Sequence, residues 1–161
     1  MRYVLLDRIT SIDLGKSLTA KKAFPLSQES FHRREIFTAT VPESLLVEAM
    51  AQAGGVLLSS EQREEPSGLV FAKIESAEFS RPVVPGEVLD ISACVMNPGE
   101  EAARLRSCIS SNSDTVAEMV YFLAYRSLEK DLQDVDERAF ERSHRERGFI
   151  LGIESLLGGE R

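Results

Sequence analysis

The longest apolar stretch of the chain predicts a buried helix. Between Leu45 and Leu58 the residues are apolar on nearly every side of a helix, a pattern typical of an element that is buried all round. Thr40 followed three residues later by Glu43 is a capping-box pattern, and Pro42 is tolerated in a first turn because its missing N–H costs nothing there. The sequence therefore predicts a central helix that begins next to Thr40.

Shorter segments have the length and alternation of strands. Residues 18–24 alternate apolar and polar positions, with Lys21 and Lys22 expected on the solvent side, and residues 102–110 place Arg104 and Arg106 opposite an apolar face. The predicted strands are 3–9, 18–24, 69–79, 87–96, 102–110 and 116–125, with turns at 13–15, 82–86, 97–99 and 111–114. One buried helix between two early and four later strands predicts an α+β fold, with an antiparallel sheet wrapped around the helix.

The composition changes after Tyr125. Residues 128–147 carry mixed charges at the spacing of a weakly amphipathic helix, and a short apolar stretch follows at 148–157. We predict a domain over residues 1–126 and a helical C-terminal extension over 127–161. The extension either docks on the sheet or a partner subunit, or remains a free tail.

The overall composition of the 161 residues excludes several classes of protein. With 43% hydrophobic and 28% charged residues the chain is of ordinary globular type, and a net charge of -7 argues against nucleic-acid binding. The helix is too short and too polar for a membrane span, and the N-terminus lacks the pattern of a signal peptide. We expect a cytoplasmic protein.

The sequence contains no motif for a metal or cofactor, so we predict none. Cys94 and Cys108 lack metal-ligand spacing and are expected to be small buried thiols rather than a disulfide.

Two polar residues interrupt the apolar helix. Glu48 and Gln52 are four residues apart and therefore share one face. A carboxylate in apolar surroundings holds its proton more tightly unless it is paired, and such acids are candidates for proton transfer. The alternative is a carboxylate that reaches a cap, a loop or a subunit interface and stabilises the fold.

These residues resemble part of a known protein family. The run Glu-Ala-Met-Ala-Gln-Ala-Gly at 48–54 closely resembles the central helix of the β-hydroxyacyl-acyl carrier protein dehydratases. Residues 79–87 (Phe-Ser-Arg-Pro-Val-Val-Pro-Gly-Glu) resemble that family's segment between two strands, and residues 3–9 resemble its first strand. The resemblance covers residues 1 to about 126 and implies the hot-dog fold, a homodimer with the sheets joined edge to edge, and a substrate carried as a thioester on acyl carrier protein or coenzyme A. An unpaired sheet edge is a physical reason to expect the same dimer.

The resemblance also implies the site. In the family a carboxylic acid on the central helix acts as the acid, which matches Glu48, and a histidine of a His-Phe-Pro-Gly motif in the other subunit acts as the base. Counting back fourteen residues from Glu48 reaches Arg34, so the expected base is absent at that position. His32 lies two residues away and is the candidate base, unless it is an ordinary surface histidine.

The chain also departs from the family pattern at the substrate-binding positions. The Pro-Gly whose N–H binds the thioester oxygen in the family is Pro42-Glu43 here, and a carboxylate at this end of a helix opposes developing negative charge. Arg81 is a candidate contact for the phosphopantetheine arm or, alternatively, an ion-pair partner, and Gln52 is expected to orient Glu48 or to accept from the backbone. An acidic carrier protein would need a local basic patch. The candidates for that patch are Lys21, Lys22, Arg33, Arg34 and Arg81.

The leading interpretation is a 3-hydroxyacyl-thioester dehydratase-like protein of fatty-acid or related acyl-chain metabolism. The alternatives are a non-catalytic acyl-binding or partner protein of the same fold, and a hot-dog acyl thioesterase. The sequence leaves open whether the chain works beside an intact dehydratase whose histidine completes a mixed site.

Overall fold

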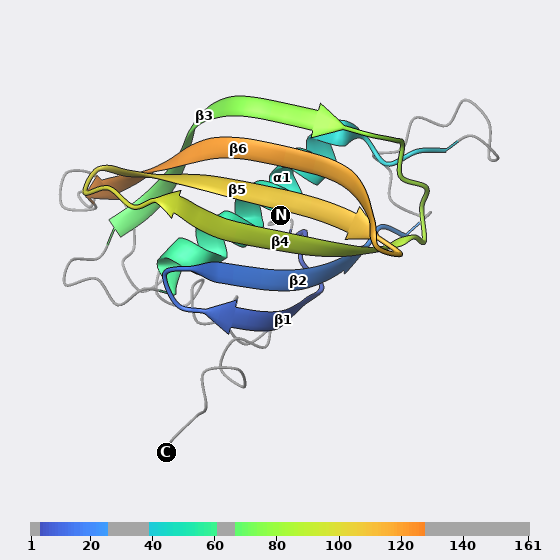
Figure 1. The fold of residues 1–161 in the computed structure, drawn as a ribbon, viewed down its shortest axis with the longest axis horizontal. Coiled ribbons are helices and arrows are strands. Elements are labelled where there is room, and N and C mark those ends of the chain that lie inside the picture. The colour runs from blue at the N-terminus through green and yellow to red at the C-terminus, as the bar shows by residue number, and fades with distance from the viewer. Residues whose placement is uncertain (1–3, 26–38, 61–66, 128–161) are drawn as a thin grey trace, which may run out of the picture.

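In the residues that the structure describes, one helix packs against one antiparallel sheet (Figure 1). A computed structural model describes residues 4–25, 39–60 and 67–127 of the chain. The elements in chain order are β1 (Arg8–Asp13), β2 (Ser17–Ala23), α1 (Glu43–Ser59), β3 (Ser67–Phe79), β4 (Val88–Asn97), β5 (Ala102–Ser111) and β6 (Asp114–Ser127). The strands form a six-stranded sheet in the order β1-β2-β4-β5-β6-β3, which confirms the predicted α+β arrangement.

The inner face of the sheet and the helix make the core. β5 shows the predicted alternation most clearly, since Ala103, Leu105, Ser107 and Ile109 are all buried. The hairpin from β5 to β6 closes at Asn112 and Ser113, whose φ angles of 50° and 72° are those of a tight hairpin turn.

The helix is buried on one side only. Its buried residues recur at helical spacing and are Leu46, Ala49, Met50, Ala53, Gly54, Leu57 and Leu58. Val47 and Val56 are half-buried and Glu48 is exposed, so the prediction of burial all round is wrong for a single chain. The reason is that one sheet covers one side of a helix, and the other apolar side is left for something else to cover.

The helix begins later than the capping-box pattern predicts. Pro42 is the N-cap residue, and within the described residues no side-chain hydrogen bond caps this end. Thr40 lies two residues before the cap, too early to bond the first-turn N–H groups, so the predicted capping box is wrong. Instead the Val41 N–H donates to the carbonyl oxygen of Val83 at 2.8 Å, which fastens the start of the helix to the loop after β3.

Two predictions about the N-terminal strands are also wrong. The first strand begins at Arg8 rather than residue 3, although Leu5 and Leu6 before it are buried in the core. Lys22 lies on the inner face with Leu18 and the other alternate residues of β2, and only 9% of its side chain is exposed. Its Nζ donates to Asp7 at 2.6 Å and lies 5.2 Å from the centre of the Phe24 ring, which explains how the core accepts an ammonium group.

The β3 strand forms one edge of the sheet. It pairs only with β6 among the described strands, and every residue from Val70 to Glu78 is exposed. Three large apolar residues are among them: Val70, Phe71 and Ile74, at 43%, 40% and 42% exposure. An edge with exposed apolar side chains is a surface that soluble proteins normally cover.

Other predictions can be tested only in part. Cys94 and Cys108 are free thiols as expected, but they are half-buried rather than buried. The helical extension and most of the loop at 27–40, with His32, Arg33 and Arg34, lie outside the described residues.

Candidate active site

The exposed face of α1 carries a chain of polar contacts that begins at Glu48. The side-chain amide of Gln52 donates from Nε2 to Oε1 of Glu48 at 2.9 Å, as their shared face predicts. The Oε1 atom of Gln52 accepts a hydrogen bond from the Leu5 N–H at 2.8 Å. The N-terminal segment, the helix and the carboxylate are therefore linked through one amide.

The Leu5 N–H fixes which way the Gln52 amide points. A backbone N–H can only donate, so the Gln52 atom that faces it must be the oxygen, and the NH₂ group must then face Glu48. The Gln52 amide therefore holds the Glu48 carboxyl group in place. The sequence offered a contact with Glu48 or with the backbone as alternatives for Gln52, and both contacts are present.

The N-terminus of α1 lies about one turn before Glu48. Glu43 is the first residue of the helix and is exposed, and its carboxylate is the acidic group of the first turn. The N–H groups at this end carry the positive end of the helix dipole, which suits an anion or a polarised oxygen. The first N–H at this end of the helix is that of Glu43, because Pro42 has none, and the Glu43 residue also brings a carboxylate to the same turn.

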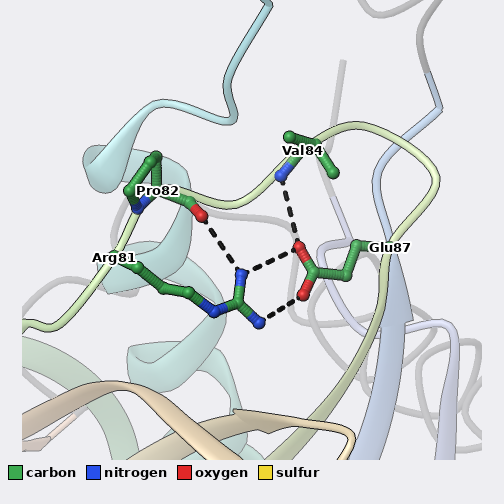
Figure 2. A network of polar contacts seen from close by, with 4 residues as sticks. All are labelled: Arg81, Pro82, Val84 and Glu87. Atoms are coloured by element: carbon green, nitrogen blue, oxygen red, sulfur yellow. Dashed lines mark hydrogen bonds and ion pairs between the residues drawn. The ribbon is translucent and has the colours of Figure 1, made fainter.

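Arg81 is held in the loop between β3 and β4 (Figure 2). Its guanidinium donates to Glu87 through both terminal nitrogens, at 2.5 and 3.3 Å, and also to the carbonyl oxygen of Pro82 at 3.2 Å. The Val84 N–H donates to the same carboxylate at 3.3 Å. The Arg81 hydrogen bonds are the main reason that the pKa of Glu87 falls from 4.5 to about 2, with smaller help from the Ser111 hydroxyl and the Val84 N–H.

This loop supports the start of the helix. Val83 is buried and its carbonyl oxygen accepts the Val41 N–H, while the Gly86 N–H donates to the carbonyl oxygen of Phe24 at 2.8 Å. The ion pair of Arg81 therefore stabilises a loop that touches both Phe24, just after β2, and Val41, the residue before Pro42. The structure gives Arg81 the ion-pair role that the sequence left as an alternative to binding substrate.

The basic patch expected for an acidic carrier does not form from Lys21 and Lys22. Lys21 donates to Asp90 at 2.6 Å and Lys22 is buried against Asp7. In the part of the chain that the structure describes, the predicted patch is thus reduced to Arg81, which is itself paired.

A polar network between sheet and helix escaped the sequence analysis. Tyr121 is buried on β6, and its hydroxyl donates to the carbonyl oxygen of Met50 at 2.9 Å and lies 3.0 Å from the Ser107 hydroxyl. Burial raises the pKa of Tyr121. The signals were a glycine in mid-helix at Gly54 and a serine on the apolar face of β5, neither of which identifies its partner.

The described residues contain neither a metal-binding cluster nor a membrane-spanning helix. No group of three or more histidine, cysteine, aspartate or glutamate side chains gathers there as a metal site. None of the helices in this part of the chain is long and apolar enough to cross a membrane.

Comparison with known proteins agrees with the geometry. The family model of the FabA-like domain matches residues 1–122. A 3-hydroxyacyl-acyl-carrier-protein dehydratase FabZ of Hydrogenobaculum sp. is 32% identical over 132 residues, which cover 80% of this chain and 89% of the relative. A FabZ of Listeria monocytogenes is 32% identical over 129 residues, with the same shares covered.

Among solved structures, the dehydratase heterocomplex ApeI:P from Xenorhabdus doucetiae matches with a TM-score of 0.66 at 18% identity, covering 81% of this chain and 88% of that one. The smu.793 protein from Streptococcus mutans, bound to acetyl CoA, matches with a TM-score of 0.64 at 12% identity, covering 79% and 94%. At such identities the likeness concerns the fold, which is the hot-dog fold.

Proposed function

Because the chain belongs to the FabA-like family of 3-hydroxyacyl-acyl-carrier-protein dehydratases, we propose that it is a hydro-lyase of acyl-chain metabolism that acts at Glu48. The observation that carries the proposal is the Glu48 carboxylate, exposed on α1 and held by the Gln52 amide at 2.9 Å. A carboxyl group that is both held and accessible suits a general acid.

The reaction follows from the positions on α1. A base takes the proton from carbon 2 of the 3-hydroxyacyl thioester, the electrons of that bond form a double bond to carbon 3, and the carbon 3 oxygen leaves as water with a proton from Glu48. The N–H groups of the first turn of α1, which begins at Glu43 directly after Pro42, are the proposed donors to the thioester oxygen on which negative charge builds. The substrate is proposed to be a thioester of acyl carrier protein or coenzyme A.

The base is proposed to be His32, brought in from the loop before the helix. It is the only histidine before Glu48 in the sequence, since the second of the two is His144. Arg34 occupies the family's base position but keeps its proton at neutral pH and is therefore unsuited to that role.

We also propose a homodimer joined at β3. The support is the exposed β3 edge with Val70, Phe71 and Ile74, together with the half of α1 that the sheet leaves uncovered. A second copy that extends the sheet across β3 would bury these apolar side chains and remove the edge.

A second candidate is a partner role in a mixed dimer. The observation that favours it is Arg34 at the base position, because a chain with a working acid and no base needs a histidine from elsewhere. One structure of similar fold is a dehydratase heterocomplex. In such a pair Glu48 would serve the partner's histidine, and the assembly would have one working site.

Location and organisation remain proposals as well. Cys94 and Cys108 are free thiols, which suits the reducing cytoplasm. The family match ends at residue 122 and the last strand at Ser127, which supports a domain over 1–126 followed by a separate extension.

The experiment is incubation of a trans-2-enoyl thioester with the wild-type chain and with His32→Ala, since hydration is the reverse reaction. Loss of enoyl absorbance in the wild type and not in His32→Ala supports a dehydratase with His32 as base. A second dehydratase that keeps its histidine but has its own acid disabled is then added. Hydration that appears only after this addition supports the mixed dimer. Release of free thiol without hydration contradicts both and indicates a thioesterase.

A further inference from the structure

The hydroxyl of Tyr121 enters the main-chain hydrogen bonding of α1. It donates to the carbonyl oxygen of Met50 at 2.9 Å and lies against Gly54, where an added Cβ would overlap it. In an α-helix the carbonyl of one residue accepts from the N–H four residues later, and Met50 and Gly54 are such a pair. One side-chain oxygen of the sheet thus touches both residues of a single hydrogen-bonded pair of the helix.

Buried groups of the sheet and the helix surround this oxygen. The Ser107 hydroxyl lies 3.0 Å from it and 3.4 Å from the Met50 carbonyl oxygen. The Tyr121 ring is wholly buried and stacks on Phe71 with 5.6 Å between ring centres. Gly54 makes room, because a Cβ there would overlap the Tyr121 hydroxyl and lie 2.9 Å from Leu105.

The opposite face of the same turn carries the candidate site. Glu48 precedes Met50 by two residues and Gln52 follows it by two, so both lie about 200° round the helix axis from Met50, away from the sheet. A side chain inserted into the main-chain ladder bends a helix. A hydroxyl that binds the Met50 carbonyl on the sheet side of the turn is placed to alter the spacing on the outer side, where Gln52 donates to Glu48.

We propose that Tyr121 is a positioning residue of this site, whose hydroxyl sets the spacing at which the Gln52 amide holds the Glu48 carboxylate. The effect on catalysis rests on the proposed function, whereas the effect on the Gln52 amide does not. Tyr121 itself touches no reacting atom, since it lies on the far side of the helix.

The test replaces Tyr121 by phenylalanine and follows two quantities. The first is the NMR signal of the Gln52 side-chain NH₂, which reports its hydrogen bond to Glu48. The second is the hydration of a trans-2-enoyl thioester, well below the melting temperature. In Tyr121→Phe we expect the Gln52 signals to shift and kcat to fall by about 10- to 100-fold with KM little changed, because misplacement of a held group affects the chemical step. Ser107→Ala, which leaves the contact with Gly54 in place, is the matched control and should leave both near wild type.

The double variant Tyr121→Phe/Ser107→Ala removes both hydroxyls and guards against loss of folding, because it leaves no buried hydroxyl without a partner. It should behave as Tyr121→Phe does. Gln52 signals that are the same in wild type and in both Tyr121 variants would overturn the proposal. A wild type without hydration activity would defeat the proposed function, and the Gln52 signals would still decide this inference.

Discussion

Removing the charge of Glu87 should destabilise the protein in a pH-dependent way. The side chain is 14% exposed and forms a two-pronged ion pair with Arg81 (Figure 2). In Glu87→Gln the Arg81 guanidinium and the Val84 N–H can donate only to a neutral amide oxygen. This oxygen is a weaker acceptor than the carboxylate. The loop that fastens the start of α1 should loosen as a result.

The magnitude follows from the pKa of Glu87. It falls from 4.5 to about 2, and each pKa unit corresponds to about 1.4 kcal/mol, so the carboxylate stabilises the folded state by at most about 3 kcal/mol. Arg81 is 38% exposed, and screening by water reduces this to about 1 to 2 kcal/mol. Because the folded pKa is lowered, the contribution is present above pH 4.5 and is lost as the pH falls toward 2.

Urea unfolding of wild type and Glu87→Gln, repeated from pH 7 to pH 3, measures this contribution as the difference between the two. The difference should be about 1 to 2 kcal/mol at pH 7 and less than half of that at pH 3. Glu118→Gln is the control, since its ion pair with Arg106 is 38% and 51% exposed and should contribute less than about 1 kcal/mol. A difference that stays constant with pH would refute the reasoning, because the loss would then come from packing rather than charge.

Two further predictions concern the helix and the β3 edge. Gly54→Ala should lower the free energy of unfolding by about 1 to 3 kcal/mol because its Cβ overlaps the Tyr121 hydroxyl, whereas Gly55→Ala, with open space at its Cβ, should be neutral or slightly stabilising. Urea unfolding of both tests this, and equal effects would contradict it. For the dimer, light scattering should give the wild type twice the 17.9 kDa mass of one chain, and Ile74→Glu should shift it toward a single chain. The exposed turn variant Leu14→Glu is the control, and a wild type that runs as one chain would contradict the proposed edge.

The part of the structure that the sequence predicts well depends on local periodicity. The alternation along β5 and the shared face of Glu48 and Gln52 need only the period of a strand or a helix, and both are observed. The family resemblance added the fold and the one recognisable site residue.

The sequence could not predict what depends on distant partners. Lys22 joins the inner face because Asp7 reaches it from fifteen residues away, and Tyr121 contacts the helix across 71 residues of chain. The exposure of one side of the helix could not be predicted for a related reason. Hydropathy shows that a face is apolar, but it does not show which part of the protein or which subunit covers that face.

The measurement that tests the central claim most directly compares wild type with Glu48→Gln in the hydration of a trans-2-enoyl thioester, with Glu118→Gln as a charge-matched control on the sheet. Glutamine keeps the shape and the contact with Gln52 but cannot transfer a proton, so kcat should fall by at least about 100-fold while the thioester still binds. Glu118→Gln should retain wild-type activity. Turnover that survives in Glu48→Gln would show that the carboxylate of this helix is not the acid, and the account of the site would be wrong.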